Sequence, residues 1–205
     1  MAPHFILEEL NEPFELIKVD RKSNAQKSAD YLALNPLGRI PTLINKEIDE
    51  NDLVIFESAA ICIHLAEANP NSKLIPKVGE HDRAKFFQWM MYLTNTVQAE
   101  LMVYFYPEKY GVDSKIAVEI VNVQEQKITA MFDLLDKELI NKDFLIGDNL
   151  TVCDYFLFML AIWADELKKP PLAFKNLSRY LCQLAKRDAI IKACKTENFS
   201  LKDYL

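Results

Sequence analysis

Hydrophobic and polar positions divide the chain into two parts that meet near residue 76. Before that point short apolar runs alternate with turn signals, and after it apolar residues recur at helical spacing over long stretches. The first part predicts the order helix, strand, helix, strand, strand, helix, which is typical of an α/β unit. The predicted helices are 3–10, 28–34 and 58–68, and the predicted strands are 14–19, 40–44 and 53–56, with an acidic turn at 47–52.

The second part predicts helices only. They cover residues 82–106, 116–139 and 151–167, and one or two more lie within 172–195. The segment 151–167 is apolar almost all round, which predicts a buried central helix, because a surface helix keeps a polar face. We therefore expect two domains, an α/β domain at 1–75 and an all-α domain at 81–205, joined by a linker around 72–80.

Composition narrows the class of protein. Half of the 205 residues are hydrophobic and 26% are charged, a balance that argues against disorder. The formal net charge is −6 and Lys and Arg are not clustered, so nucleic acid is not an expected partner. No apolar run approaches the roughly 18 residues that a membrane span needs, and the N-terminus has no signal-peptide pattern. We expect a cytoplasmic protein that has no membrane partner.

Cysteines and histidines form no metal-ligand pattern, so we predict no metal site. The cysteines stand far apart, with neither a C-x-x-C pair nor histidines at ligand spacing. We interpret them as reduced structural thiols that behave as small hydrophobic residues. Four glycines also leave no room for a phosphate-binding glycine-rich loop. The residues considered are Cys62, Cys153, Cys182, Cys194, His4, His64 and His81.

Two polar residues at the start of the predicted buried helix form a capping box. Thr151 stands at the N-cap and Asp154 three residues later, so each side chain can satisfy a backbone N–H that the helix leaves unpaired. The function of this motif is structural.

The run from Asn35 to Leu43, N-P-L-G-R-I-P-T-L, places a proline at the entrance to a predicted strand. A cis Ile40–Pro41 bond would turn the backbone of Ile40 outward, where an extended peptide could add as a short strand. The alternative is a turn before an edge strand, because proline removes a ladder donor.

Glu57 and Ser58 stand where the third predicted strand ends and a helix begins. Helix N-termini attract anions, so Ser58 could bind a carboxylate through its hydroxyl and amide while Glu57 holds an ammonium group. That pair of charges suits the γ-glutamyl end of glutathione. The alternative is an ordinary helix cap with a nearby acid.

Together these motifs resemble those of the cytosolic glutathione transferases of bacterial type. The N-P-x-G-x-I-P-T-L run, E-S-A-A-I-x-x-H-L-A, S-K-L-I-P and the T-x-x-D box follow in the family's order over nearly the whole chain. The resemblance implies a thioredoxin-like α/β N-terminal domain, an all-α helical C-terminal domain, a homodimer, and glutathione bound as a substrate. Carried over by position, it implies that Ile40 pairs with the cysteinyl part of glutathione, that Pro41 is cis, and that Glu57 and Ser58 hold the γ-glutamyl end.

Several positions depart from the family pattern. Leu37 stands where bacterial members often have Lys, and Thr96 and Gln98 stand where beta-type members have Glu and His, so we do not assign the beta type. The family fold begins with a strand and a loop that carries a catalytic Ser, Cys or Tyr, whereas here the first predicted helix follows Met1 directly. We expect either a start upstream of Met1 or a sheet rebuilt without that strand. The thiol-activating residue is unassigned, and we interpret His4 as a surface residue.

Three functions fit this resemblance. The first is transfer of the glutathione thiol to a small hydrophobic electrophile, with Tyr92 and Tyr104 lining the electrophile pocket. The second is a non-catalytic binding or regulatory protein on the same fold, like the stringent starvation proteins. The third is a glutathione-dependent isomerisation or dehalogenation. Aromatic residues at helical spacing also have a plainer interpretation, as packing between helices.

Overall fold

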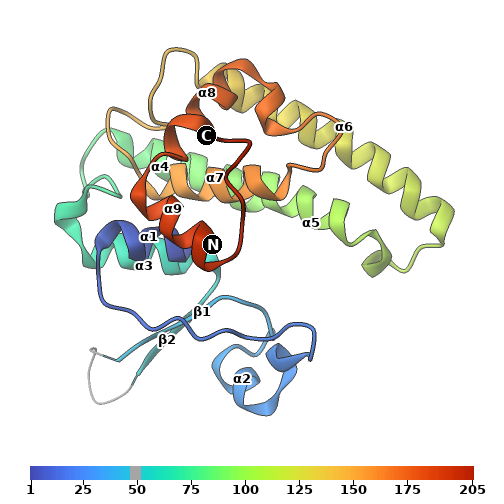
Figure 1. Cartoon of the computed structure of the whole chain (residues 1–205), viewed down its shortest axis with the longest axis horizontal. Helices are drawn as coiled ribbons and strands as arrows, with labels where there is room; N and C mark the ends of the chain where they lie inside the picture. The colour runs from blue at the N-terminus through green and yellow to red at the C-terminus, as the bar shows by residue number, and fades with distance from the viewer. Residues whose placement is uncertain (47–51) are drawn as a thin grey trace.

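The computed structural model of the chain describes residues 1–46 and 52–205. Its elements appear in Figure 1. The helices are α1 (Ala2–Leu10), α2 (Ala29–Leu34), α3 (Ser58–Ala68), α4 (Asp82–Tyr92), α5 (Ala99–Phe105), α6 (Ser114–Glu138), α7 (Val152–Trp163), α8 (Lys175–Leu184) and α9 (Asp188–Thr196). The strands are β1 (Thr42–Asn45) and β2 (Leu53–Phe56). Short helical turns are η1 (Ala25–Lys27), η2 (Pro70–Ser72), η4 (Pro107–Tyr110) and η5 (Pro171–Ala173). The predicted acidic turn at 47–52 lies almost wholly outside the described residues.

Most elements predicted before residue 76 are present. Pro3 lies in the first turn of α1, where a missing N–H costs no helical hydrogen bond. The Ser28 hydroxyl caps α2 by accepting a hydrogen bond from the N–H of Tyr31 at 3.3 Å. β1 begins at Thr42 rather than at residue 40, because Pro41 has no N–H for the strand ladder.

The predicted strand at 14–19 is wrong, because the segment forms neither strand nor helix. A strand needs a neighbour for its N–H and C=O groups, and the strand pairing in the described residues joins only β1 to β2. Phe14, Leu16 and Ile17 are 36%, 52% and 70% exposed. In Figure 1 this dark-blue trace crosses in front of the sheet without joining it.

β1 and β2 form an antiparallel pair in which Thr42 lies opposite Phe56 and Asn45 opposite Leu53. All eight strand residues are half-buried. α3 contacts both strands. A two-stranded sheet is marginally stable alone, so this helix supplies the apolar surface against which the hairpin rests.

The helices after residue 76 surround α7, as the sequence predicts for a central helix. Its 12 residues include 11 that are buried, from Val152 to Ile162. The helix lies in the middle of the helical bundle in Figure 1. The predicted final segment consists of two helices, α8 and α9.

The capping box at the start of α7 is confirmed and extended by further partners. The Asp154 carboxylate accepts hydrogen bonds from the N–H of Thr151 at 2.6 Å, the N–H of Leu145 at 2.8 Å and the hydroxyl of Tyr180 at 2.6 Å. Burial raises the pKa of Asp154, although these hydrogen bonds favour its charged form. One side chain therefore ties the loop before α7, the helix itself and α8 together.

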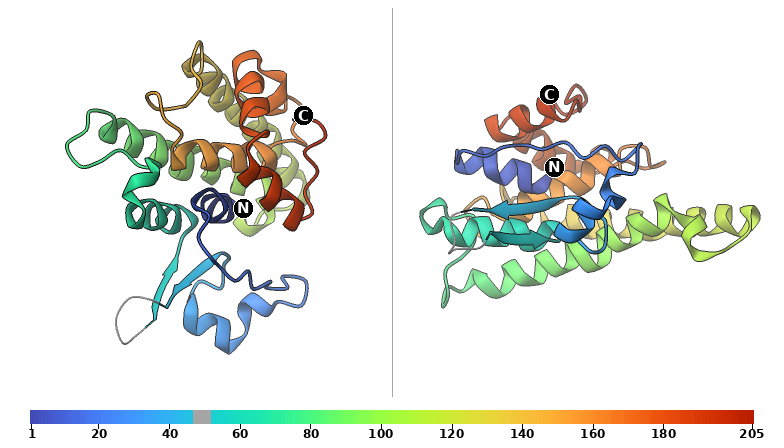
Figure 2. Two further views of the ribbon diagram at one scale, coloured as in Figure 1. Left: turned by 60° about the vertical axis from the view of Figure 1, so that its left-hand side comes forward. Right: turned by 90° about the horizontal axis from the view of Figure 1, so that it is seen from below.

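The predicted helix at 82–106 is continuous but not uniform. A π-helical segment, η3 (Leu93–Gln98), joins α4 to α5. α5 packs along α6, and the two project beyond the other helices as an arm that ends near η4. Figure 2 shows this arm extending past the rest of the molecule.

α1 lies against the helical part of the chain, where it packs on α9, α7 and α3. Near its end the Glu9 carboxylate accepts hydrogen bonds from the Tyr155 hydroxyl and from Arg187 Nη2, both at 2.5 Å. Arg187 Nε also donates to the Tyr155 oxygen at 3.1 Å. The first helix is thus held by polar contacts to α7 and to the start of α9.

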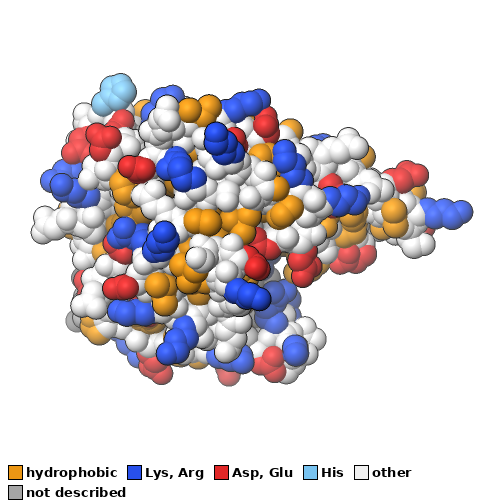
Figure 3. Space-filling model, turned by 45° about the horizontal axis from the view of Figure 1, so that its top comes forward, with side chains coloured by type: hydrophobic (Ala, Val, Ile, Leu, Met, Phe, Trp, Pro, Cys, Tyr) orange, Lys and Arg blue, Asp and Glu red, His pale blue; other side chains and the backbone are white. Residues whose placement is uncertain are grey.

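The molecular surface mixes charged side chains of both signs with smaller apolar areas, as one face shows in Figure 3. Among the described residues, no helix is both long and apolar enough to span a bilayer. The division into domains at 1–75 and 81–205 remains a prediction.

Candidate functional site

The loop that precedes β1 is held by side chains from α2 and from the loop itself. Asn35, which is buried, donates from Nδ2 to the carbonyl of Arg39 at 2.7 Å and accepts from the N–H of Leu37 at 3.1 Å. The Tyr31 hydroxyl donates to the same Arg39 carbonyl at 2.8 Å. These three hydrogen bonds fix the backbone next to Ile40.

Gly38 and Lys27 meet in the same loop. Gly38 has φ +56°, and a Cβ there would lie 2.7 Å from both the Gln26 carbonyl oxygen and Lys27 Nζ. Lys27 Nζ donates to the carbonyl of Leu37 at 2.9 Å. The glycine of N-P-x-G thus allows the backbone of Gln26 and the side chain of Lys27 to approach Gly38 closely. Lys27, from η1, places a cation at this loop, and the sequence spacing alone does not predict it.

The Ile40–Pro41 peptide bond is cis, as the resemblance implied. Ile40 is 45% exposed, and its backbone makes no hydrogen bond to another described residue. Its N–H and its C=O are therefore both without a partner among the described residues.

Glu57 and Ser58 lie at the N-terminus of α3. Glu57 has φ 71° and ψ 114°, a conformation that costs a non-glycine residue about 1–3 kcal/mol and that is typical of binding sites. No side chain caps this helix, and within the described ranges neither Glu57 nor Ser58 has a side-chain hydrogen bond or ion pair. The first N–H groups of α3 therefore remain available to an anion.

Strand register brings these two pairs of residues together. Thr42 lies opposite Phe56, so Pro41, which precedes Thr42, and Glu57, which follows Phe56, adjoin at one end of the hairpin. Ile40 and the N-terminus of α3 consequently lie near each other at that end of the hairpin. This arrangement suits a zwitterionic peptide with one extended stretch.

Tyr92 and Tyr104 lie elsewhere, on the long helix formed by α4, η3 and α5. The Tyr92 hydroxyl donates to the Met131 carbonyl at 3.4 Å, and burial raises its pKa. The pKa of Tyr104 is raised by burial and by Glu125. Within the described residues, no hydrogen bond or ring contact joins these two tyrosines to each other or to the hairpin end. Tyr92 is therefore engaged in packing between helices.

His4 is not a surface residue, so that interpretation is wrong. It is 5% exposed, and its Nδ1 lies 2.9 Å from a carboxylate oxygen of Glu197 while Nε2 lies 3.6 Å from Glu8. Its ring also meets Phe14 edge to face, with centroids 5.5 Å apart. Nδ1 faces Glu197 because α9 packs on α1, a contact that the local sequence does not encode, whereas Glu8 lies one turn further along α1 itself.

Burial disfavours ionisation of three cysteines and five tyrosines among the described residues. Burial raises the pKa of Cys62 and Cys153, and raises that of Cys194 to about 11, which agrees with their interpretation as structural thiols. Cys182 is partly exposed. Every described tyrosine with a shifted pKa has it raised, chiefly by burial.

Two cavities lie away from the hairpin end. One, of about 400 Å³, lies between the ends of α1 and α3, and the other, of about 200 Å³, lies under the linker beside Ile75 and Ile146. Across residues 1–46 and 52–205, no group of three His, Cys, Asp or Glu side chains has a metal-binding arrangement.

Comparison with known families decides the assignment. The profile described as "Glutathione S-transferase, N-terminal domain" matches residues 1–67, and the profile of the C-terminal domain matches residues 96–188. The chain belongs to the glutathione S-transferase family. Its thioredoxin-like N-terminal domain has a small sheet, and its C-terminal domain is helical.

Individual relatives agree with this assignment. Glutathione S-transferase GstB of Escherichia coli strain K12 is 32% identical over 194 residues, which cover 91% of this chain and 88% of GstB. A glutathione transferase homologue from Sulfitobacter, solved with bound glutathione, superposes with a TM-score of 0.85 at 21% identity, covering 97% of this chain and 93% of that one. The bacterial beta-class transferase of Sphingomonas chungbukensis gives a TM-score of 0.82 at 26% identity, covering 97% and 94%.

Proposed function

We propose that this family member binds glutathione at the end of the hairpin and transfers its thiol to small hydrophobic electrophiles. In that reaction the glutathione sulfur, as a thiolate, forms a bond to an electrophilic carbon. The leaving group departs as its anion, and the thiol proton passes to solvent. We further propose a homodimer that acts in the cytoplasm in the removal of reactive compounds.

The observation that carries this proposal is the meeting of Ile40, Pro41, Glu57 and Ser58 at one end of the sheet. Glutathione has an α-carboxylate and an ammonium on one carbon, followed by an extended peptide. The α3 N-terminus and Ser58 would bind that carboxylate, Glu57 the ammonium, and the backbone of Ile40 the cysteinyl group. The bound glutathione in the Sulfitobacter homologue supports this proposal.

Lys27 extends the proposed site. Its ammonium lies at the Leu37 carbonyl, three residues before Ile40 in the same loop. A peptide paired with Ile40 runs along this loop, so we propose that Lys27 attracts the glycyl carboxylate. Lys27 would then supply the positive charge that bacterial members often have as a lysine at the position of Leu37.

Retention on immobilised glutathione tests the binding step. The double variant Glu57→Ala, Ser58→Ala should lose retention, whereas Glu15→Ala, Ser23→Ala, exposed positions in the same part of the chain, should keep it. Equal retention of both variants would refute the site. Turnover of a neutral aryl halide by the retained protein then tests transfer.

One observation favours the second candidate, a binding protein without transferase activity. Burial raises the pKa of Cys62, Cys153 and Cys194, so none of these three described cysteines is available as an ionised catalytic thiol. Retention on glutathione without turnover would support this candidate and remove the transferase activity from this chain.

A further inference from the structure

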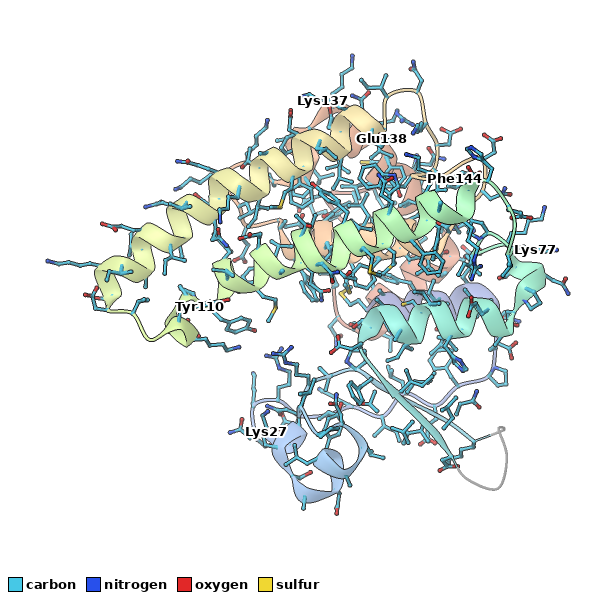
Figure 4. The ribbon with its side chains drawn as sticks, turned by 180° about the vertical axis from the view of Figure 1, so that it is seen from behind. Lys27, Lys77, Tyr110, Lys137, Glu138 and Phe144 are labelled. Carbon is cyan, nitrogen blue, oxygen red and sulfur yellow. The ribbon has the colours of Figure 1, made fainter. Side chains whose placement is uncertain are left out.

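One polar contact joins the turn before η1 to the end of the helical arm. Arg21 Nη2 donates to the hydroxyl of Tyr106 at 3.3 Å, although 85 positions separate the two residues. Tyr106 is the single residue between α5 and η4. In Figure 4 Tyr110, at the free end of the arm, and Lys27, on the part that carries η1, lie on opposing sides of the region that this contact bridges.

Two cations converge on the same tyrosine. Lys109 Nζ lies 3.6 Å from the centre of the Tyr106 ring, while Arg21 binds its hydroxyl. Neither cation has an ion pair among the described residues, in contrast to Lys168 and Arg187, which each bind a carboxylate. Their charge is therefore not neutralised by the protein.

The surrounding charge is positive as well. Residues 18–22 and 106–110 contain four basic and two acidic residues, in a chain whose formal net charge is −6. One of the acids, Asp20, is engaged locally, because it accepts from the N–H of Lys22 at 3.0 Å. These two segments thus attract anions, most strongly at low salt, whereas Tyr104 beside them also feels the charges of Glu125, Glu166 and Lys168.

An aromatic surface adjoins the cations. The rings of Tyr104 and Phe105 lie edge to face with centroids 5.3 Å apart, and those of Phe105 and Tyr106 do so at 6.5 Å. Phe105 is 37% exposed, so part of this surface is open to a ligand. Aromatic side chains favour aromatic ligands through the same edge-to-face and stacked arrangements.

We propose that the electrophile site takes aromatic compounds that carry a negatively charged group, with Arg21 and Lys109 as the residues that determine this specificity. The aromatic part would contact the rings at residues 104–106 and the carboxylate or sulfonate would face the two cations. This inference rests on the proposed glutathione site, because the electrophile must lie beside the bound thiol. Neutral aryl compounds would bind the same rings without the ionic contribution.

Conjugates of glutathione test the inference without requiring catalysis. The ligands are S-methylglutathione, S-(4-carbamoylbenzyl)glutathione and S-(4-carboxybenzyl)glutathione, the last two having nearly the same shape but different charge. Calorimetry at low salt should show the carboxylate bound about three- to tenfold more tightly than the amide, as expected for two exposed ion pairs. In Arg21→Gln, Lys109→Gln the ratio should fall towards one, whereas the control Lys175→Gln, an exposed position on α8, should keep it.

The possible outcomes distinguish failure of the proposed specificity from failure of the proposed glutathione binding. Equal affinity for amide and carboxylate in the unmodified protein, or an unchanged ratio in the double variant, would overturn the specificity while leaving the glutathione site intact. Weaker binding of S-methylglutathione by the double variant would also overturn it, because Arg21 and Lys109 would then hold glutathione itself. Failure of the unmodified protein to bind any of the three would overturn the proposed function and this inference together.

Discussion

The segment from residue 11 to residue 60 and the helix α7 differ sharply in how they are stabilised. In the described part of that segment only Asn35 and Gly38 are buried, whereas α7 buries 11 of its 12 residues. The core that surrounds α7 also includes α1, which begins the chain. The proposed binding residues lie in or beside the poorly buried segment. The residues that stabilise the fold and the residues proposed to bind a ligand therefore lie in different parts of this molecule. In the poorly buried segment, backbone groups that the fold leaves unpaired can bind a ligand.

The largest effect should come from removing the carboxylate that anchors α7. Asp154→Ala leaves the buried N–H groups of Leu145 and Thr151 and the hydroxyl of Tyr180 unpaired, which should cost about 3 kcal/mol or more. Urea unfolding followed by circular dichroism measures this loss. The control Asp133→Ala, an exposed partner of Lys137, should change stability by less than about 1 kcal/mol. Similar losses of unfolding free energy in Asp154→Ala and Asp133→Ala would contradict the conclusion that the buried contacts around α7 stabilise the fold most.

An intermediate effect is expected at α8, whose first turn is capped from α6. Asp136 accepts hydrogen bonds from the N–H of Asn176 at 2.6 Å and the N–H of Leu177 at 2.9 Å. Asp136→Ala should cost about 0.5–2 kcal/mol at pH 7, the usual range for a lost cap. Urea unfolding, again beside Asp133→Ala, measures the difference.

The same cap predicts a pH dependence. Burial opposes ionisation of Asp136, but the hydrogen bonds from Leu177 and Asn176 outweigh it and hold its pKa below the usual value. The folded state therefore binds fewer protons here than the unfolded state, so the contribution is present above about pH 4 and is lost as pH falls through the folded pKa. The gap between the unmodified protein and Asp136→Ala should shrink from pH 7 to pH 2. If the difference in stability between the two proteins instead grew as pH falls, the pKa of Asp136 would be raised rather than lowered in the folded state.

A smaller effect on stability, but a clear one on binding, is expected in the loop before β1. Asn35→Ala removes two hydrogen bonds that hold this loop. It should weaken glutathione binding about tenfold, because a factor of ten corresponds to the usual contribution of one buried hydrogen bond. Hydrogen exchange at Leu37 should accelerate, while global unfolding shifts little because the loop lies outside the core. Exposed Asn71→Ala is the control. A global loss as large as that of Asp154→Ala would show that the two regions unfold as one.

The smallest effect is expected at 14–19. Ile17→Ala should change the free energy of unfolding by less than about 0.5 kcal/mol, because Ile17 is largely exposed. The same substitution at Ile6, which is fully buried on α1, should cost about 2–5 kcal/mol. Comparable losses at both positions would mean that residue 17 is packed in solution.

The sequence predicted those features that depend on neighbours in the chain. The capping box of α7, the bounds of α3 and β2, and the junctions at Pro41 and Ser58 all follow from local chemistry, namely a missing donor or an unpaired N–H. Whether the four proposed binding residues hold glutathione stays a prediction.

What the sequence did not predict depends on partners far along the chain. The 14–19 run has the composition of a strand, yet a strand exists only where another pairs with it. His4 contacts Glu197 and Arg21 contacts Tyr106. These partners lie so far apart in the sequence that hydrophobic periodicity cannot predict that they meet. The π-helical segment is likewise hidden, because its residues fit an ordinary helix equally well.

That π segment at Leu93–Gln98 lets the long helix hold one residue more than an ordinary α-helix with the same number of turns. An α-helix turns by about 100° for each residue, and a π turn accommodates one residue more than an α turn. Deleting a single residue there would therefore restore ordinary α-helix and leave the residues beyond it on nearly the same face. Deleting a residue from α5, which has no wide turn to absorb the loss, would instead rotate everything beyond it by about 100° and move Tyr106 away from Arg21. The wide turn is thus a point at which this helix tolerates a change of length.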